Sequence, residues 1–431
     1  MTSGSTMNRR RFLQTSGLAA SAVALAGCAK GTGSGPVAAN TITSAGWDDG
    51  INGLMNGSIA EGFKAQSGVT LQPQASVAFG DFQTRFRTLL AGGEPPDVMR
   101  LNDDFVREVT DKQLTKDLPP YFDKSGLNRD DYFPIFDFAK LPGGQRAMIV
   151  GTQVRCIFYN KTMFEKEGVP LPPTTWTGDG WMWEDFLAAA KALSKGGDQW
   201  GAVITKDTSY ENTFSVNNGG EGIFSVDGKK FTLADPAGVE AIQWAADLAL
   251  VHKVMPTYGD IQADQAEQRL FTAGKLGMVL NSSSNIGYYD KNVSDFEWDI
   301  APIPAKVNQI QEGGVVVYVI PEKAKNPDQA WDYLNYAAGP EGGRALAQSG
   351  LCVPVYRAAA SALKAPGDYP KTIKLLVEGA DHSQAVNSTT ATAAAVAIYR
   401  PQLQRVYTGE VTAEEALSSV RSQVEAAIAG D

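Results

Sequence analysis

Short apolar runs alternate with amphipathic helical patterns along most of the chain. Residues 41–43, 69–71 and 96–101 are apolar runs of strand length, and residues 51–66 and 81–91 between them carry apolar side chains at helical spacing. Strands that are separated by helices form parallel βαβ units. The pattern therefore predicts an α/β fold, in which ligands bind at the carboxyl ends of the strands.

The first 40 residues have a different pattern. Consecutive arginines before Phe-Leu (residues 9–13) precede an apolar run over residues 17–26, and small residues then lead to Cys28. This segment resembles a twin-arginine export signal with a lipobox, so we expect residues 1–27 to be a cleaved signal peptide and Cys28 to carry lipid. The apolar run is far shorter than the roughly 20 residues that span a bilayer. An ordinary cleaved signal is the alternative, and residues 28–40 are expected to form a flexible tether after the lipidated cysteine.

Composition and charge narrow the function classes. The chain is 43% hydrophobic and 20% charged, as in ordinary globular proteins. Its net charge of -10 argues against a nucleic-acid partner, because an acidic surface repels phosphate backbones. Two histidines and the absence of HExxH, GxSxG and P-loop spacings give little basis for a metal site, a cofactor or catalysis. A hydrolase with paired carboxylates stays open from composition alone.

Two cysteines remain after Cys28. Cys156 and Cys352 are too far apart in sequence to form a CxxC motif. In an exported chain they can form a disulfide, or they can remain as two buried free thiols.

A series of short sequence blocks follows in order along the chain. The blocks are FKAQSGV (63–69), LLAGGEPPDV (89–98), IFYNKTMF (157–164), PPTTW (172–176), WMWEDF (181–186), NNGG (217–220), FTAGKLGM (271–278), DIAPIP (299–304), NPDQAWDYL (326–334) and SGLCVP (349–354). Together they resemble family 1 extracellular solute-binding proteins of ABC importers, the carbohydrate-binding group that includes maltose-binding protein. Many of these residues are also typical of turns, helix starts and core packing, so the blocks indicate the family more than the ligand contacts.

The resemblance implies a type II periplasmic-binding-protein fold, in which hinge strands join two α/β lobes around a ligand cleft. It implies crossings between the lobes near residues 150–154, 302–314 and 351–355. Cys156 and Cys352 lie near two of these crossings, so a hinge disulfide is one alternative for them. The implied N-terminal lobe is residues 41–150 plus 315–350, and the implied C-terminal lobe is residues 151–314 plus 351–431.

The resemblance also implies a function. A protein of this kind captures a sugar in the cleft and delivers it to a membrane permease, whose cytoplasmic ATPase subunits drive transport. It would be a monomer without a cofactor, lipid-anchored to the outer face of the cytoplasmic membrane, and it would not be an enzyme. The alternatives are the same fold with a polyol, glycerol phosphate or amino-acid-like solute, and, less favoured, an exported glycosidase-type enzyme.

A sugar site needs polar side chains for the hydroxyls and aromatic rings for the C–H faces. Trp47, Asp48 and Asp49 follow the first predicted strand and are the first choice. The candidate loops hold more Asp and Asn than Arg or Lys, which favours a neutral polyhydroxy ligand over a phosphate. The further candidates, several of which are equally typical of helix caps or turns, are Phe79, Asp81, Asn102, Asp103, Tyr210, Asn212, Asn217, Asn218, Asn281, Ser282, Ser283, Tyr356 and Arg357.

Overall fold

A computed structural model describes residues 40–176, 180–204, 208–263 and 265–430. The predicted signal peptide, the lipidation site Cys28 and nearly all of the tether lie outside these residues. Asn40–Asp431 form one compact unit. Within the described part of the chain, no helix combines the length and apolarity that a membrane crossing requires.

The first sheet has six strands in the order β13-β6-β12-β3-β1-β2. Strand β1 pairs in parallel with both β2 and β3, which confirms the predicted βαβ units, whereas β12 is antiparallel to β3 and β6, and β13 is antiparallel to β6. The sheet is therefore mixed. Its strands are β1 (Thr41–Ala45), β2 (Thr70–Pro73), β3 (Val98–Leu101), β6 (Met148–Gln153), β12 (Gly314–Val319) and β13 (Val353–Pro354).

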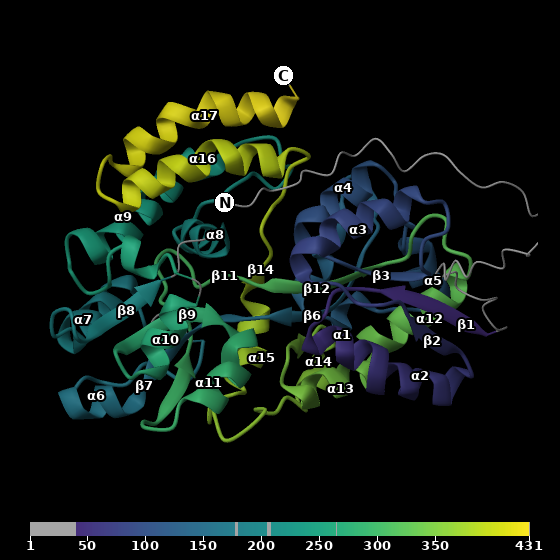
Figure 1. Ribbon diagram of the computed structural model, residues 1–431, viewed down its shortest axis with the longest axis horizontal. Helices are drawn as coiled ribbons and strands as arrows, with labels where there is room; N and C mark the ends of the chain where they lie inside the picture. The colour runs from purple at the N-terminus through teal and green to yellow at the C-terminus, as the bar shows by residue number, and fades with distance from the viewer. Residues whose placement is uncertain (1–39, 177–179, 205–207, 264, 431) are drawn as a thin grey trace, which may run out of the picture. The chain divides into compact units, whose positions relative to one another are not determined.

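Helices cover both faces of this sheet, with α3 and α4 on one face and α1, α2 and α13 on the other (Figure 1). The predicted helix over residues 51–66 is continuous in sequence but contains a π-helical turn, and Gly57 within it has non-helical dihedral angles. Gly68 ends it at a φ of 76°, as the glycine pattern predicts. The helices are α1 (Gly50–Leu54), the π turn η1 (Met55–Ile59), α2 (Ala60–Ser67), α3 (Phe79–Ala91), α4 (Val106–Asp111), α5 (Pro119–Ser125), α12 (Pro327–Ala338), α13 (Pro340–Ser349) and α14 (Arg357–Ala360).

The second sheet has four strands in the order β10-β7-β9-β8. Strands β8 and β9 are parallel, and β7 is antiparallel to β9 and β10. The strands are β7 (Arg155–Asn160), β8 (Trp200–Ile204), β9 (Leu276–Ser282) and β10 (Trp298–Ala301). The helices are α6 (Lys161–Glu167), α7 (Trp183–Leu193), α8 (Thr208–Asn217), α9 (Pro236–Leu250), α10 (Ala266–Thr272), α11 (Ile286–Asn292), α15 (Leu375–Asp381), α16 (Thr392–Tyr407) and α17 (Ala413–Ala429).

Short elements complete the described chain. Strand β11 (Gln311–Glu312) pairs in parallel with β14 (Ser383–Gln384), and β4 (Lys140–Leu141) forms a hairpin with β5 (Gly144–Gln145). The 3-10 turns are η2 (Asp103–Phe105), η3 (Arg129–Asp131), η4 (Pro134–Ala139), η5 (Thr232–Ala234), η6 (Gly259–Ile261) and η7 (Ser283–Asn285).

The chain passes between the two sheets three times. It leaves the six-stranded sheet between β6 and β7 and returns between β10 and β12. The last passage is later than the sequence predicts, because β13 still pairs with β6 after the predicted boundary at Gly350. The chain reaches the second sheet near Tyr369 and Thr372, whose amides donate to Asp290 and Asp299. We call the part built on the six-stranded sheet the N-terminal lobe and the part built on the four-stranded sheet the C-terminal lobe.

The core has two hydrophobic clusters. The larger one includes residues of both sheets, and the smaller one joins residues 223–233 and α9 to the C-terminal helices α16 and α17. The aromatic rings of Phe231 and Tyr399 stack at 5.3 Å in the smaller cluster. This packing fixes the last two helices on the C-terminal lobe.

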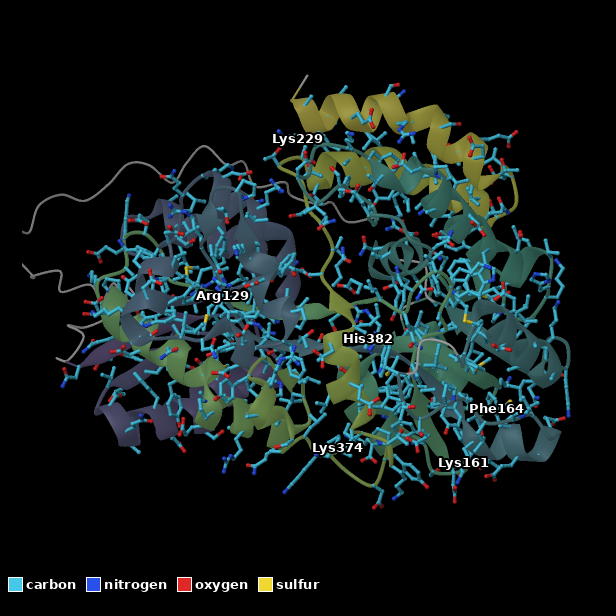
Figure 2. All side chains as sticks on the ribbon, turned by 180° about the vertical axis from the view of Figure 1, so that it is seen from behind. Arg129, Lys161, Phe164, Lys229, Lys374 and His382 are labelled. Atoms are coloured by element: carbon cyan, nitrogen blue, oxygen red, sulfur yellow. The ribbon has the colours of Figure 1, made fainter. Side chains whose placement is uncertain are left out.

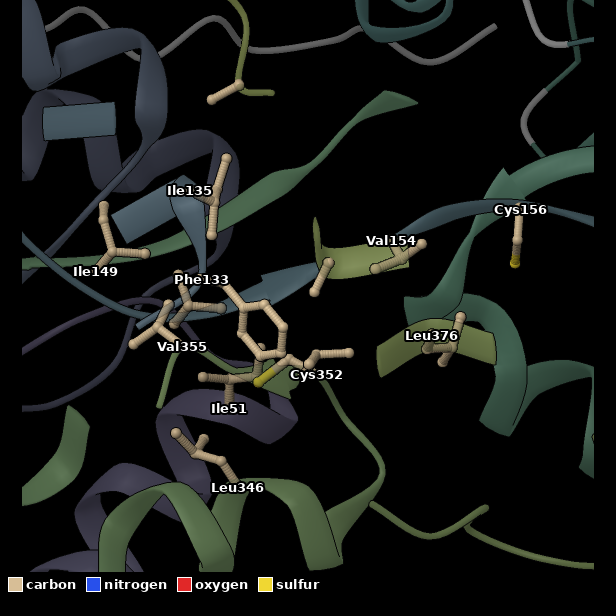
Figure 3. Close-up of a cluster of buried hydrophobic side chains, with 14 of the residues drawn as sticks. Ile51, Phe133, Ile135, Ile149, Val154, Cys156, Leu346, Cys352, Val355 and Leu376 are labelled. Carbon is tan, nitrogen blue, oxygen red and sulfur yellow. The ribbon is translucent and has the colours of Figure 1, made fainter. Parts of the chain in front are cut away.

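Cys156 and Cys352 are buried free thiols, so the hinge disulfide is not formed. Figure 3 shows Cys352 among core side chains that include Phe133 and Leu346, with Cys156 lying away from it. Burial raises the pKa of Cys156, and it raises that of Cys352 to about 12. Both groups are therefore protonated and unreactive at neutral pH.

Gly201 on β8 allows the strand to lie close to α7, because a Cβ there would fall 1.8 Å from the Ala190 carbonyl oxygen. We expect Gly201→Ala to lower the free energy of unfolding by about 2 kcal/mol or more through overpacking. Urea denaturation measures this change. Gly53→Ala is the matched control, since Gly53 is an exposed helical position with no atom within 4 Å of the added carbon. The control should gain roughly 0.5 kcal/mol, and a similar loss in both variants would contradict the packing argument.

Candidate functional site

Asp49 organises the loop after β1. One carboxylate oxygen accepts the Asn52 amide at 2.7 Å and caps α1, and the other accepts the Trp47 indole N–H at 2.9 Å. Asp49 also forms an ion pair with Arg100, which lies on β3 and is only 5% exposed. A single carboxylate therefore connects the ends of two neighbouring parallel strands.

Arg100 also stacks on Trp47. Its guanidinium carbon lies 3.9 Å from the centre of the indole ring, and Phe82 meets the same ring edge-on at 5.2 Å. Across the sheet, Arg100 is the register partner of Tyr318. Burial raises the pKa of the Tyr318 hydroxyl, and the Arg100 charge partly opposes this rise. These contacts leave Trp47 buried, so its ring supports the loop, whereas Asp48 beside it is exposed.

The other predicted residues of the N-terminal lobe follow β2 and β3. Asp81 is exposed in the first turn of α3, and Asn102 and Asp103 are half-buried where η2 begins. Phe79 is the first residue of α3, and its side chain lies outside the described structure. Among the predicted residues, Asp48 and Asp81 are thus the exposed acidic groups at this edge of the sheet.

In the C-terminal lobe, several predicted residues form a hydrogen-bonded network. The Tyr210 hydroxyl donates to Asn281 at 3.2 Å, and Asn281 donates to the Tyr289 hydroxyl at 3.2 Å. Ser283 fixes the first crossing, because its amide donates to the Val154 carbonyl and its hydroxyl accepts the Val154 amide at 3.1 Å. The neighbouring Ser282 hydroxyl accepts the amide of Ser284, which shapes the turn after β9.

Three predicted asparagines have internal partners on or after α8. Asn212 accepts the Ile223 amide at 3.0 Å, and Asn217 accepts the Trp183 indole N–H at 3.0 Å. Asn218 donates to the Ala237 carbonyl at 3.1 Å and to Glu240 at 3.0 Å. These bonds hold the end of α8 against the surrounding core.

The crossings contain two charged residues that the sequence analysis did not single out. Arg155, the first residue of β7, forms a 3.0 Å ion pair with Glu312 on β11, which is 1% exposed. The Arg155 amide also donates to Gln311 at 2.8 Å, and Gln311 reaches Ser383 on β14. The sequence signal for Arg155 and Glu312 was their position at or beside a predicted crossing. Side-chain contacts therefore tie the first two passages of the chain to each other and to β14.

A pocket of about 410 Å³ is lined by residues from both lobes. The N-terminal lobe contributes Arg107 on α4 and residues from η4 to β4, and the C-terminal lobe contributes Val226, Ile310 and a polar run after α15. In Figure 2, His382 marks that run between the lobes, and Arg129 marks the N-terminal lobe. The remaining lining residues are Val106, Pro134, Ile135, Asp137, Phe138, Lys140, Leu141, Asp381, His382, Ser383, Gln384, Ala385, Asn387 and Ser388.

The described lining of this pocket contains none of the predicted site residues. Arg357 is connected to it, since its guanidinium pairs with Asp381 at 2.7 Å and donates to the Tyr132 carbonyl at 2.9 Å. Tyr356 packs edge-on against Tyr132 at 5.5 Å. The polar residues within 381–388 were the sequence signal for this pocket. They lie between two helices, and ligand contacts were expected at the ends of predicted strands. No group of three metal-ligating side chains occurs among the described residues.

The family model for bacterial extracellular solute-binding proteins matches residues 51–344, about two thirds of the chain. The chain belongs to this family. The chain is similar to a binding protein of Brucella abortus (strain 2308), with 26% identity over 204 residues. These residues are 46% of this chain and 47% of that protein. The match thus spans about half the length of this relative.

Solved structures show the same fold. An ABC substrate-binding protein of Listeria monocytogenes, in complex with cycloalternan, matches with a TM-score of 0.75 at 21% identity, over 89% of this chain and 97% of that chain. A sugar transporter protein of Rhizobium etli in an open conformation matches with a TM-score of 0.76 at 18% identity, over 90% and 100%. The cyclic alpha-maltosyl-1,6-maltose binding protein of Arthrobacter globiformis matches with a TM-score of 0.73 at 20% identity, over 92% and 100%.

Asp49→Ala should destabilise this solute-binding protein by about 3 kcal/mol, because it removes a helix cap and leaves the buried Arg100 charge without its carboxylate. Chemical denaturation measures the loss. Asp48→Ala removes the neighbouring exposed carboxylate and should change stability by less than about 0.5 kcal/mol. Equal losses in the two variants would show that Arg100 does not depend on Asp49.

Glu312→Gln tests the charge pair at the crossings. It leaves Arg155 without a compensating charge in a buried position, so we expect a loss of about 3 kcal/mol in the free energy of unfolding. Glu297→Gln is the matched control, because Glu297 is exposed and pairs with Lys161 at the surface. That change should have a far smaller effect on stability. A small effect of Glu312→Gln would show that the crossings are held without the ion pair.

Proposed function

We propose that this solute-binding protein captures a carbohydrate between its two lobes and delivers it to the permease of an ABC importer. The observation that carries the proposal is the pocket of about 410 Å³, whose lining comes from both lobes. Its volume is within the range of about 300–1,000 Å³ that is typical of small-molecule sites. A ligand in this position contacts side chains of both lobes at once.

The chemistry of the pocket suits a polyhydroxy ligand. Asn387, Gln384 and Ser388 can exchange hydrogen bonds with hydroxyl groups, and Phe138 provides an apolar surface for the C–H face of a sugar ring. Asp48 and Asp81, which are exposed at the strand ends, remain candidate contacts for a larger sugar. Among the neighbours, the solved complexes contain cycloalternan in one case and alpha-D-tagatose in another, which supports the carbohydrate class.

Closure of the lobes would couple binding to delivery. A ligand that touches both lobes stabilises the closed arrangement, because only this arrangement brings both sets of contacts onto one molecule. The closed form would then dock on the permease. The export signal and Cys28 support a lipid anchor, which would keep the protein at high effective concentration near the membrane.

A thermal-shift screen of the purified protein against monosaccharides, oligosaccharides, polyols and amino acids tests the proposal. A ligand at 100 times its dissociation constant stabilises the native state by about 2.7 kcal/mol. For a body of this size that corresponds to a rise of about 3 °C in Tm. We expect such a rise with a carbohydrate, and the sugar should be recovered unchanged.

Other outcomes would redirect the proposal. A shift with polyols or amino acids alone would keep the binding role and change the solute class. Conversion of the sugar to product would identify an enzyme and contradict the proposal, and no shift with any solute would leave the binding role without support.

A further inference from the structure

Arg107 is a buried arginine in the wall of the interlobe pocket. It lies in the first turn of α4 and is 8% exposed. One terminal nitrogen donates to the Val226 carbonyl at 3.5 Å, while its Nε is buried without a hydrogen-bond partner. Its guanidinium therefore reaches from the N-terminal lobe to the C-terminal lobe with much of its donor capacity unused.

Arg100, which is as deeply buried as Arg107, has a carboxylate partner, and so do the partly buried Arg155 and Arg400. Arg100 pairs with Asp49, Arg155 with Glu312, and Arg400 with Glu211. Among the side chains that the structure describes, no carboxylate lies within ion-pair distance of Arg107. Burial of a charge is costly unless an opposite charge compensates it. Among the described side chains, the positive charge of Arg107 in the pocket wall is therefore not balanced by an ion pair.

The acidic residues of the pocket are already neutralised. Asp137 forms an ion pair with Arg129, and Asp381 forms an ion pair with Arg357. Both carboxylates are about half-exposed, so they lie toward solvent, and Lys140 adds another positive charge to the lining. Among the described lining residues, Arg107 and Lys140 therefore carry positive charges that no ion pair balances.

Gly228 shapes the space around the guanidinium. It has a φ of +70°, and an added Cβ would come within 2.9 Å of the guanidinium carbon of Arg107 and 2.6 Å of the Ser388 carbonyl oxygen. The backbone of the C-terminal lobe can therefore approach Arg107 only because this position has no side chain. The contact places Arg107 beside Asn387 and Ser388, which also line the pocket.

We propose that the solute carries a carboxylate, as in a hexuronic acid, and that Arg107 binds it. The inference rests on the proposed function and specifies its substrate class. A guanidinium binds a carboxylate through two parallel hydrogen bonds, and one arginine balances one negative charge. A phosphate dianion fits less well, because it carries a second negative charge that the single guanidinium of Arg107 does not balance. This differs from the neutral ligand that the loop composition favours.

The first test uses the unchanged full chain. Isothermal titration with D-glucuronate, D-glucuronamide and D-glucose, and with the corresponding galactose series, compares a carboxylate with a neutral group of nearly the same shape. We expect the uronate of at least one series to bind more tightly than its amide and parent sugar by on the order of ten- to hundredfold. The uronate preference should weaken as salt concentration rises.

The second test uses variants. Arg107→Gln should abolish the preference for the uronate over the uronamide, and Arg107→Lys should retain part of it. Arg87→Gln is the matched control, because Arg87 is exposed on α3 and pairs with Glu108 outside the pocket. The control should keep the full preference. If Arg107→Gln does not fold, the uronate and uronamide affinities of the unchanged chain decide the question.

Several results would overturn the inference. Equal or tighter binding of the neutral sugars would do so and would leave the proposed function intact. Tighter binding of glucose 6-phosphate than of the uronates would replace the carboxylate with a phosphate. Unchanged uronate preference in Arg107→Gln would remove Arg107 from the site. Failure of every carbohydrate in the wider screen, neutral or acidic, would instead contradict the proposed function itself.

Discussion

The relation between the two sheets depends on compensation of charge at the crossings. Glu312 is almost completely buried, and a buried carboxylate requires an opposite charge close by. Arg155 supplies that charge only when the first and second passages of the chain lie side by side. Gln311, the next residue, adds β14 to the same group through its bond to Ser383. A few side chains therefore hold the strands around which the lobes would move.

The same rule of charge compensation separates structural arginines from a candidate ligand-binding arginine. Arg100 is buried and paired, and it connects β3 to the loop after β1. Arg107 is equally buried but has, among the described side chains, no carboxylate partner. A fold stabilised by paired charges can leave one arginine unpaired where a bound solute supplies the missing charge. The contrast is informative because the two residues are close in sequence: Arg100 lies on β3, and Arg107 follows that strand.

Much of the fold could be predicted because its signals are local. Gly68 ends a helix through its left-handed conformation, and the apolar spacing over residues 51–66 gives one buried face. The candidate site could be predicted less well. Trp47 and Asp49 were expected at a strand end and lie there, yet their indole and carboxylate groups bond to each other and to Arg100. A position at a strand end predicts where a residue lies in the fold. The partners of its side chain depend on residues that are far away in sequence.

The sequence by itself determined the alternation of strands and helices and the family, because these are carried by spacing and by short ordered blocks. Tertiary structure alone decided three things: that β13 stays in the six-stranded sheet, that Cys156 and Cys352 remain free, and that Arg107 packs against Gly228 of the other lobe. The physical reason is that burial and charge pairing depend on which distant segments share a space. No local pattern encodes that proximity.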